Sequence, residues 1–157
     1  MRRLAVVALC AFAGAAAAQD APPAPYGLPI TLAQAQRVAA AAETEARRLN
    51  FNVAIAVVEP SGQLIHFQRI DGANYAAGEA AQDKARSAAG FRLSTRVWAV
   101  EGSKPGGAWV LGLKGAVPLE GGVPIVAGGR TIGGIGVSGV SSDDDARVAQ
   151  AGAAAVR

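Results

Sequence analysis

Several chemically versatile residue types are scarce in this chain of 157 residues. It has one cysteine, one methionine and one histidine, and aromatic side chains make up only 5% of it. A lone cysteine excludes an intramolecular disulfide and a cysteine-rich zinc site. Charged residues are also few, at 17%, whereas hydrophobic residues reach 51%, which indicates a folded chain rather than a disordered one.

The first eighteen residues have the pattern of a secretory signal peptide. Arg2 and Arg3 form a basic start, residues 4–14 are apolar, and Ala16 and Ala18 form an A-x-A site, so we expect cleavage after Ala18. The apolar run is shorter than the roughly 20 residues that a membrane-spanning helix needs. The pattern predicts a periplasmic or secreted protein from which the single cysteine has been removed.

The charge balance after cleavage gives no sign of nucleic-acid binding. Loss of Arg2 and Arg3 lowers the number of basic residues from 15 to 13, against 12 acidic ones. The net charge then falls from +3 to about +1. Residues 19–29 hold four of the eight prolines and are expected to form a mobile, extended lead-in, followed by a single domain at residues 30–157.

The pattern of apolar residues predicts a mixture of helices and hairpins. A capping box formed by Thr31 and Gln34 opens a first helix, with Asn50 as its left-handed C-terminal cap. Alanine stripes predict further helices, and short apolar runs predict strands. The expected helices cover residues 31–49, 76–90, 94–101 and 141–156, and the expected strands cover residues 53–58, 63–70, 123–127 and 130–138.

This order of elements predicts an α+β fold with an antiparallel sheet. Gly128 and Gly129 suit a two-residue hairpin loop with positive φ at both positions. Ser94 and Thr95 are expected to cap the third helix. Residues 102–115 contain five glycines and lack periodicity, so we expect a loop there that serves as a lid, an interface arm or a mobile segment.

Two motifs suggest ligands but have simpler structural interpretations. Gly134, Gly136 and Gly139 match the GxGxxG pattern of dinucleotide-binding proteins, but the 18 residues that follow cannot complete a βαβ unit. We interpret these glycines as sites of close packing. Residues 143–145 are three aspartates at a helix start, and we interpret them as a solvated cap rather than a cation site.

His66 is the only histidine and the strongest candidate metal ligand. Two interpretations of it stay open: a packing residue in a half-buried strand, or a neutral imidazole that serves as axial ligand to haem iron. The other side chains that could donate to iron are Tyr26, Tyr75, hydroxyls such as that of Thr95, and the lysines.

Four motifs, taken in order, resemble the GlcG/HbpS family of haem-binding or haem-degrading proteins. They are residues 62–73 (GQLIHFQRIDGA), 81–88 (AQDKARSA), 121–125 (GGVPI) and 133–139 (GGIGVSG), and the resemblance covers about residues 30–156. It implies a three-layer α-β-α sandwich with an antiparallel sheet of about five strands, assembled into a homo-oligomer that is often an octamer. It also implies that some members are exported and bind haem or iron, whereas other members accompany glycolate or diol metabolism without a settled activity.

The resemblance also selects four polar positions, namely Arg69, Asp71, Lys84 and Thr95. Two roles for them stay open. Arg69 and Asp71 could form a structural pair at the turn, or Arg69 and Lys84 could hold an anionic group such as a haem propionate. His66 stands where a small residue is expected in the family, so it is not an inherited ligand.

Two functions of different class follow. The first is an exported, oligomeric haem- or iron-binding protein, haem-degrading or redox-sensing, with His66 or an oxygen donor on the iron and basic side chains on the propionates. The second is an enzyme or accessory subunit that acts on a small oxidised metabolite, a hydroxy acid or aldehyde, in a pocket near residues 102–115. We expect no nucleic-acid partner and no transmembrane segment after cleavage.

Overall fold

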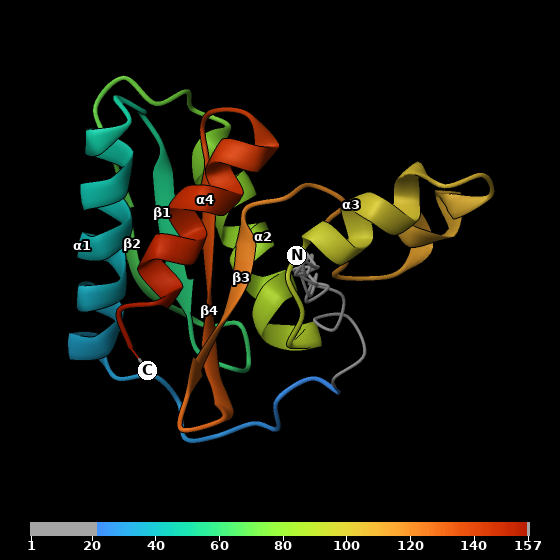
Figure 1. The fold of residues 1–157 in the computed structure, drawn as a ribbon, viewed down its shortest axis with the longest axis horizontal. Helices are drawn as coiled ribbons and strands as arrows, with labels where there is room; N and C mark the ends of the chain where they lie inside the picture. The colour runs from blue at the N-terminus through green and yellow to red at the C-terminus, as the bar shows by residue number, and fades with distance from the viewer. Residues whose placement is uncertain (1–21, 157) are drawn as a thin grey trace, which may run out of the picture.

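The computed structural model describes residues 22–156, so the predicted signal peptide lies outside the described residues. One antiparallel sheet runs through it in the order β2-β1-β4-β3 (Figure 1). Its strands are β1 (Ala54–Val58), β2 (Leu64–Arg69), β3 (Gly122–Ala127) and β4 (Arg130–Ser138). The helices are α1 (Leu32–Arg48), α2 (Ala77–Phe91), α3 (Arg96–Ser103), the 3-10 helix η1 (Gly107–Gly112) and α4 (Ser142–Ala153).

The predicted α+β class is confirmed, but the expectation of about five strands is wrong for the described part of the chain, which has four. Between α3 and β3 the chain forms η1 and a glycine-containing loop instead of another strand. Glycine disfavours strand formation because it contributes no side chain to a sheet face and loses the most backbone entropy on folding.

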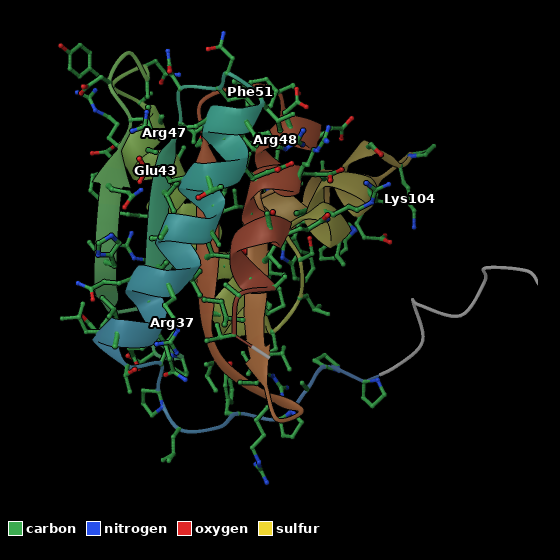
Figure 2. All side chains as sticks on the ribbon, turned by 60° about the vertical axis from the view of Figure 1, so that its left-hand side comes forward. Arg37, Glu43, Arg47, Arg48, Phe51 and Lys104 are labelled. Atoms are coloured by element: carbon green, nitrogen blue, oxygen red, sulfur yellow. The ribbon has the colours of Figure 1, made fainter. Side chains whose placement is uncertain are left out.

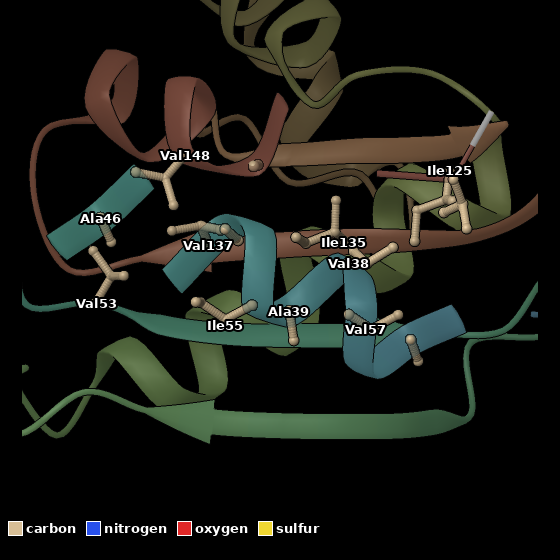
Figure 3. Close-up of a cluster of buried hydrophobic side chains, with 14 of the residues drawn as sticks. Val38, Ala39, Ala46, Val53, Ile55, Val57, Ile125, Ile135, Val137 and Val148 are labelled. Carbon is tan, nitrogen blue, oxygen red and sulfur yellow. The ribbon is translucent and has the colours of Figure 1, made fainter. Parts of the chain in front are cut away.

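The core lies on both faces of the sheet. As a result, the central strand β1 is buried along its whole length. Ile55 and Val57 point toward a large apolar cluster that includes side chains of α1 and α4 (Figure 3). Ala54, Ala56 and Val58 point the other way and pack against the alanines of α2. This agrees with the sequence, in which β1 is apolar at successive positions rather than at alternate ones.

The glycines of β4 bring α2 unusually close to the sheet. A Cβ atom on Gly136 would lie only 1.9 Å from the carbonyl oxygen of Ala81, and one on Gly134 would lie 2.5 Å from that of Ala85. The interpretation of the GxGxxG match as close packing is therefore confirmed for these two positions. The β3–β4 loop also has the expected form, since Gly128 and Gly129 both have positive φ.

The lead-in is attached to the sheet, a contact that no pattern in the sequence predicts. The Thr131 amide donates to the Pro25 carbonyl at 2.8 Å, and the Gly27 amide donates to the Thr131 carbonyl at 2.9 Å. Thr131 lies on β4 beyond the last residue that pairs with β1, and there Tyr26 forms a parallel bridge with it. The lead-in thus occupies the place beside β4 that β1 leaves vacant.

Helix α3 and η1 form an arm that projects from the rest of the molecule (Figure 1). The predicted cap of α3 is wrong in part, because Thr95 makes no side-chain capping bond, while Ser94 Oγ accepts from the Arg96 amide at 3.3 Å. Thr95 Oγ1 instead accepts from the Gly122 amide at 2.9 Å and so links the base of the arm to β3.

Candidate functional site

His66 lies on the edge strand β2, on the face that packs against α1. It pairs with Val57 of the core cluster, and its Nε2 atom is 3.1 Å from Gln68 Oε1. Gln68 Nε2 donates in turn to Glu43 Oε2 at 2.8 Å. Because a carboxylate only accepts, the amide of Gln68 must turn its oxygen to His66, and the imidazole must carry its proton on Nε2. His66 Nδ1 is then the nitrogen with a free lone pair.

Glu43 anchors this hydrogen-bonded chain from α1. Hydrogen bonds from Arg47 and then Gln68 hold the pKa of the Glu43 carboxyl below its ordinary value, against the opposing effect of burial. Arg47 Nε donates to Glu43 Oε1 at 2.7 Å within α1, and Figure 2 labels both side chains. The ionised carboxylate therefore fixes the amide orientation that sets the His66 tautomer.

Arg69 points to the opposite face of the sheet from His66. It pairs with Ala54, whose side chain faces α2, and its guanidinium lies over the ring of Tyr75 at 4.9 Å from the centroid. It also donates to the Ala73 carbonyl at 3.3 Å. Within residues 22–156, Arg69 forms no ion pair with Asp71, which is exposed in the turn after β2. The arginine steadies this turn through Tyr75 and Ala73.

Lys84 is buried on the side of α2 that packs against the sheet, and its ammonium group is hydrogen-bonded within the protein. Its Nζ lies 2.8 Å from Asp145 Oδ2 and donates to the Val137 carbonyl at 3.1 Å, with Ser138 Oγ at 3.4 Å. Burial raises the pKa of the Asp145 carboxyl, and the Lys84 ammonium and the Val140 amide oppose that rise. The prediction that all three aspartates form a solvated cap is wrong for Asp145, which is 2% exposed.

Thr95 lies close to Lys84, beside the start of β3. A Cβ atom on Gly122 would be 2.4 Å from both the Lys84 carbonyl oxygen and Thr95 Cγ2. Lys84 and Thr95 are thus brought together, whereas His66 and Arg69 lie on opposite faces of β2. The polar atoms of Lys84 and Thr95 bond to the protein itself, so the five predicted residues do not line one common cavity.

The structure has several hollows, and one of them was not indicated by the sequence. The one that we call the foot hollow has a volume of about 760 Å³ and lies between the lead-in, the start of α1 and the β3–β4 hairpin. Its lining comes from segments about 100 residues apart, so no local motif could indicate it. A second hollow of about 500 Å³, the arm hollow, lies between α3 and η1 and includes Gly102, Gly107 and Pro118.

Neither a metal cluster nor a membrane span occurs in the described part of the chain. Residues 22–156 contain no group of three or more His, Cys, Asp or Glu side chains arranged to hold a metal ion. None of the helices described there is both long and apolar enough to cross a bilayer.

The fold and hollows define a small α+β domain built on one antiparallel sheet. A family model described as "Haem degrading protein HbpS-like" matches residues 30–154, and the chain belongs to this HbpS-like family. It is also 38% identical over 104 residues to Protein GlcG of Escherichia coli (strain K12), which covers 66% of this chain and 77% of that protein.

Solved structures agree with this assignment. The chain is similar to the crystal structure of HbpS, with a TM-score of 0.76 and 34% identity over 83% of this chain and 92% of that one. It is also similar to PduOC in its complex with haem, with a TM-score of 0.75 and 27% identity over 83% and 96% of the two chains. The predicted GlcG/HbpS-like family is confirmed.

Proposed function

We propose that this protein binds haem. The match of residues 30–154 to the HbpS-like family carries this proposal, and the similarity to the haem complex of PduOC supports it. Haem combines a large apolar ring, two carboxylates and an iron that accepts nitrogen or oxygen donors. When bound, it would supply a redox-active iron.

The predicted site residues differ in whether their polar atoms are available to contact haem. Lys84 and Thr95 use their polar atoms inside the protein, so they suit a structural role. His66 is only half-buried and offers an imidazole, so we keep it as the proposed iron ligand. Arg69 lies on the opposite face of β2 from His66 and its guanidinium stacks on Tyr75, so a haem ligated by His66 would need another cation for its propionates.

Titration of the purified protein with hemin tests the proposal. We expect a shift of the Soret band at micromolar hemin, and the absence of any shift would contradict haem binding. If His66 ligates the iron, His66→Ala will change the shifted spectrum, whereas Gln63→Ala on the adjoining turn will not. Loss of the Soret band under a reductant in air would extend the function to haem degradation.

We further propose that the protein is exported and acts as a homo-oligomer. Export is supported by the basic, apolar and small-residue pattern of residues 1–18. Cell fractionation tests it, with a chain that lacks residues 2–18 expected to stay inside the cell. Assembly is supported by the exposed apolar side chains of the arm, among them Trp109 and Leu111.

An alternative function rests on the arm hollow. Its volume of about 500 Å³ lies within the range of about 300–1,000 Å³ that is usual for small-molecule sites. We propose it as the place where a hydroxy acid or aldehyde would bind if the protein acts on a small metabolite. Amide NMR during titration with glycolate tests this, with shifts expected at Gly102 and Gly107 but not at Gly128 in the distant hairpin.

A further inference from the structure

We propose that the foot hollow binds an apolar molecule that carries a carboxylate, and that Arg130 holds this carboxylate. The inference rests on the proposed haem function only for the identity of the ligand, since haem with its propionates belongs to this chemical class. The site itself is defined by the residues that line the hollow.

The wall of the foot hollow is preformed. The lead-in is fastened to β4 by the hydrogen bonds between Thr131 and the backbone of Pro25 and Gly27. Gly27 has no side chain to separate the two segments, and a Cβ atom there would lie 2.9 Å from Arg130 Cβ and 3.3 Å from Ile132 Cγ2. The lead-in therefore lies directly on the base of the Arg130 side chain.

Tyr26 is fixed in the same wall. Its hydroxyl donates to the Gly90 carbonyl at 2.7 Å, and the guanidinium of Arg92 lies 4.9 Å from the centroid of its ring. With both its polar end and one ring face engaged, the side chain has little freedom to collapse into the hollow. A rigid site loses less entropy when a ligand binds.

The lining is mostly apolar and partly open to water. Ile132 is nearly buried at the base, whereas Leu28 at the rim is 86% exposed and Tyr26 is 43% exposed. Exposed apolar side chains that gather at a hollow mark a binding site more often than scattered ones do. The volume of about 760 Å³ is within the range of small-molecule sites.

Arg130 is the only charged side chain among the nine residues that line the foot hollow. Its Nη1 donates to the Tyr26 carbonyl at 3.1 Å, which holds the guanidinium at the wall. Within residues 22–156 the structure records no acceptor for its other N–H groups. Among the other polar side chains there, Thr31 and Gln34 bond to each other in the α1 capping box, and the Tyr26 hydroxyl donates to the Gly90 carbonyl. One guanidinium beside an apolar surface is suited to an apolar carboxylate.

Hemin titrations of matched variants test the site. Arg130→Gln removes the charge and keeps a polar, though shorter, side chain, and we expect hemin to bind at least about tenfold more weakly. Leu28→Glu, at a position exposed enough to spare the fold, should also weaken binding. Arg86→Gln is the control, because Arg86 is an exposed arginine of α2 that pairs with Asp83 outside the hollow.

The outcomes separate this site from the proposed function. Hemin affinity that is equal in wild type, Arg130→Gln and Leu28→Glu would overturn the site while haem binding itself stands. If hemin does not bind the wild type, the proposed function fails, and calorimetry with dodecanoate tests the hollow alone. Dodecanoate binding that Arg130→Gln weakens and Arg86→Gln does not would support the site, and no binding would overturn it.

Discussion

Lys84 and Asp145 are the two charged side chains that the fold removes from water within residues 22–156. Each is 3% exposed as a side chain, and the two are joined at 2.8 Å. Taking both charges out of water is costly, and the geometry offsets this through the extra bonds from Lys84 to Val137 and from the Val140 amide to Asp145. The pair joins α2 to the start of α4.

Removing either partner should therefore destabilise the fold strongly. We expect Lys84→Met to lower the free energy of unfolding by about 3–5 kcal/mol, because it leaves the Asp145 carboxylate buried without its cation. The double variant Lys84→Met with Asp145→Leu should regain part of the loss. Urea denaturation measures both, with Lys114→Met as an exposed control, and a loss below about 1 kcal/mol in the single variant would contradict the role.

The tautomer of His66 is a second prediction at the level of residues. We expect neutral His66 to carry its proton on Nε2, because Glu43 orients Gln68 and Gln68 accepts from the imidazole. Nitrogen-15 chemical shifts of the imidazole measure this directly. Gln68→Leu should shift the population toward the Nδ1–H form, and a wild type that is already mainly Nδ1–H would show the hydrogen-bonded chain to be absent.

At the level of elements, the packing of α2 on β4 depends on glycine. We expect Gly136→Ala to destabilise the protein by about 1–3 kcal/mol or more, because its methyl group would overlap the Ala81 carbonyl. Gly90→Ala is the matched control, since no atom outside the backbone of its own helix lies within 4 Å of the added Cβ and alanine favours the helix. Thermal melts should rank Gly90→Ala at or above wild type and Gly136→Ala below, and equal melting temperatures would refute the close approach.

Local signals predicted the elements well, and distant contacts explain what they missed. The Thr31–Gln34 capping box and the left-handed Asn50 both occur as expected, because each depends on a few neighbouring residues. Threonine commonly caps helices, yet the hydroxyl of Thr95 bonds to Gly122, 27 residues away. Asp145 and the foot hollow were missed for the same reason, since their surroundings come from elements that only the fold brings together.

At the level of the whole molecule, the arm is notable for the apolar side chains that it exposes to water. Val97 and Val100 lie one turn apart on α3 and remain partly exposed, and Trp109 and Leu111 are more exposed still. Apolar side chains on a projecting segment are typical of an interface between subunits.

We therefore expect Val100→Glu to reduce the mass of the assembly measured by light scattering, because a carboxylate would be buried in the subunit contact. Val140→Glu is the control, as Val140 has similar exposure but lies outside the arm, between β4 and α4. A wild type that is monomeric, or a mass that falls only in Val140→Glu, would refute the arm as the interface.

The attachment of the lead-in to Thr131 also sets an order of events during synthesis. Pro25 and Gly27 leave the ribosome early, whereas the β4 residue to which they bond is made about 100 residues later. Contacts between segments so far apart form late, because the whole intervening chain must first be brought together. The region next to the predicted signal peptide therefore stays free of the sheet until almost the entire chain exists, and this is the interval that the proposed export would use.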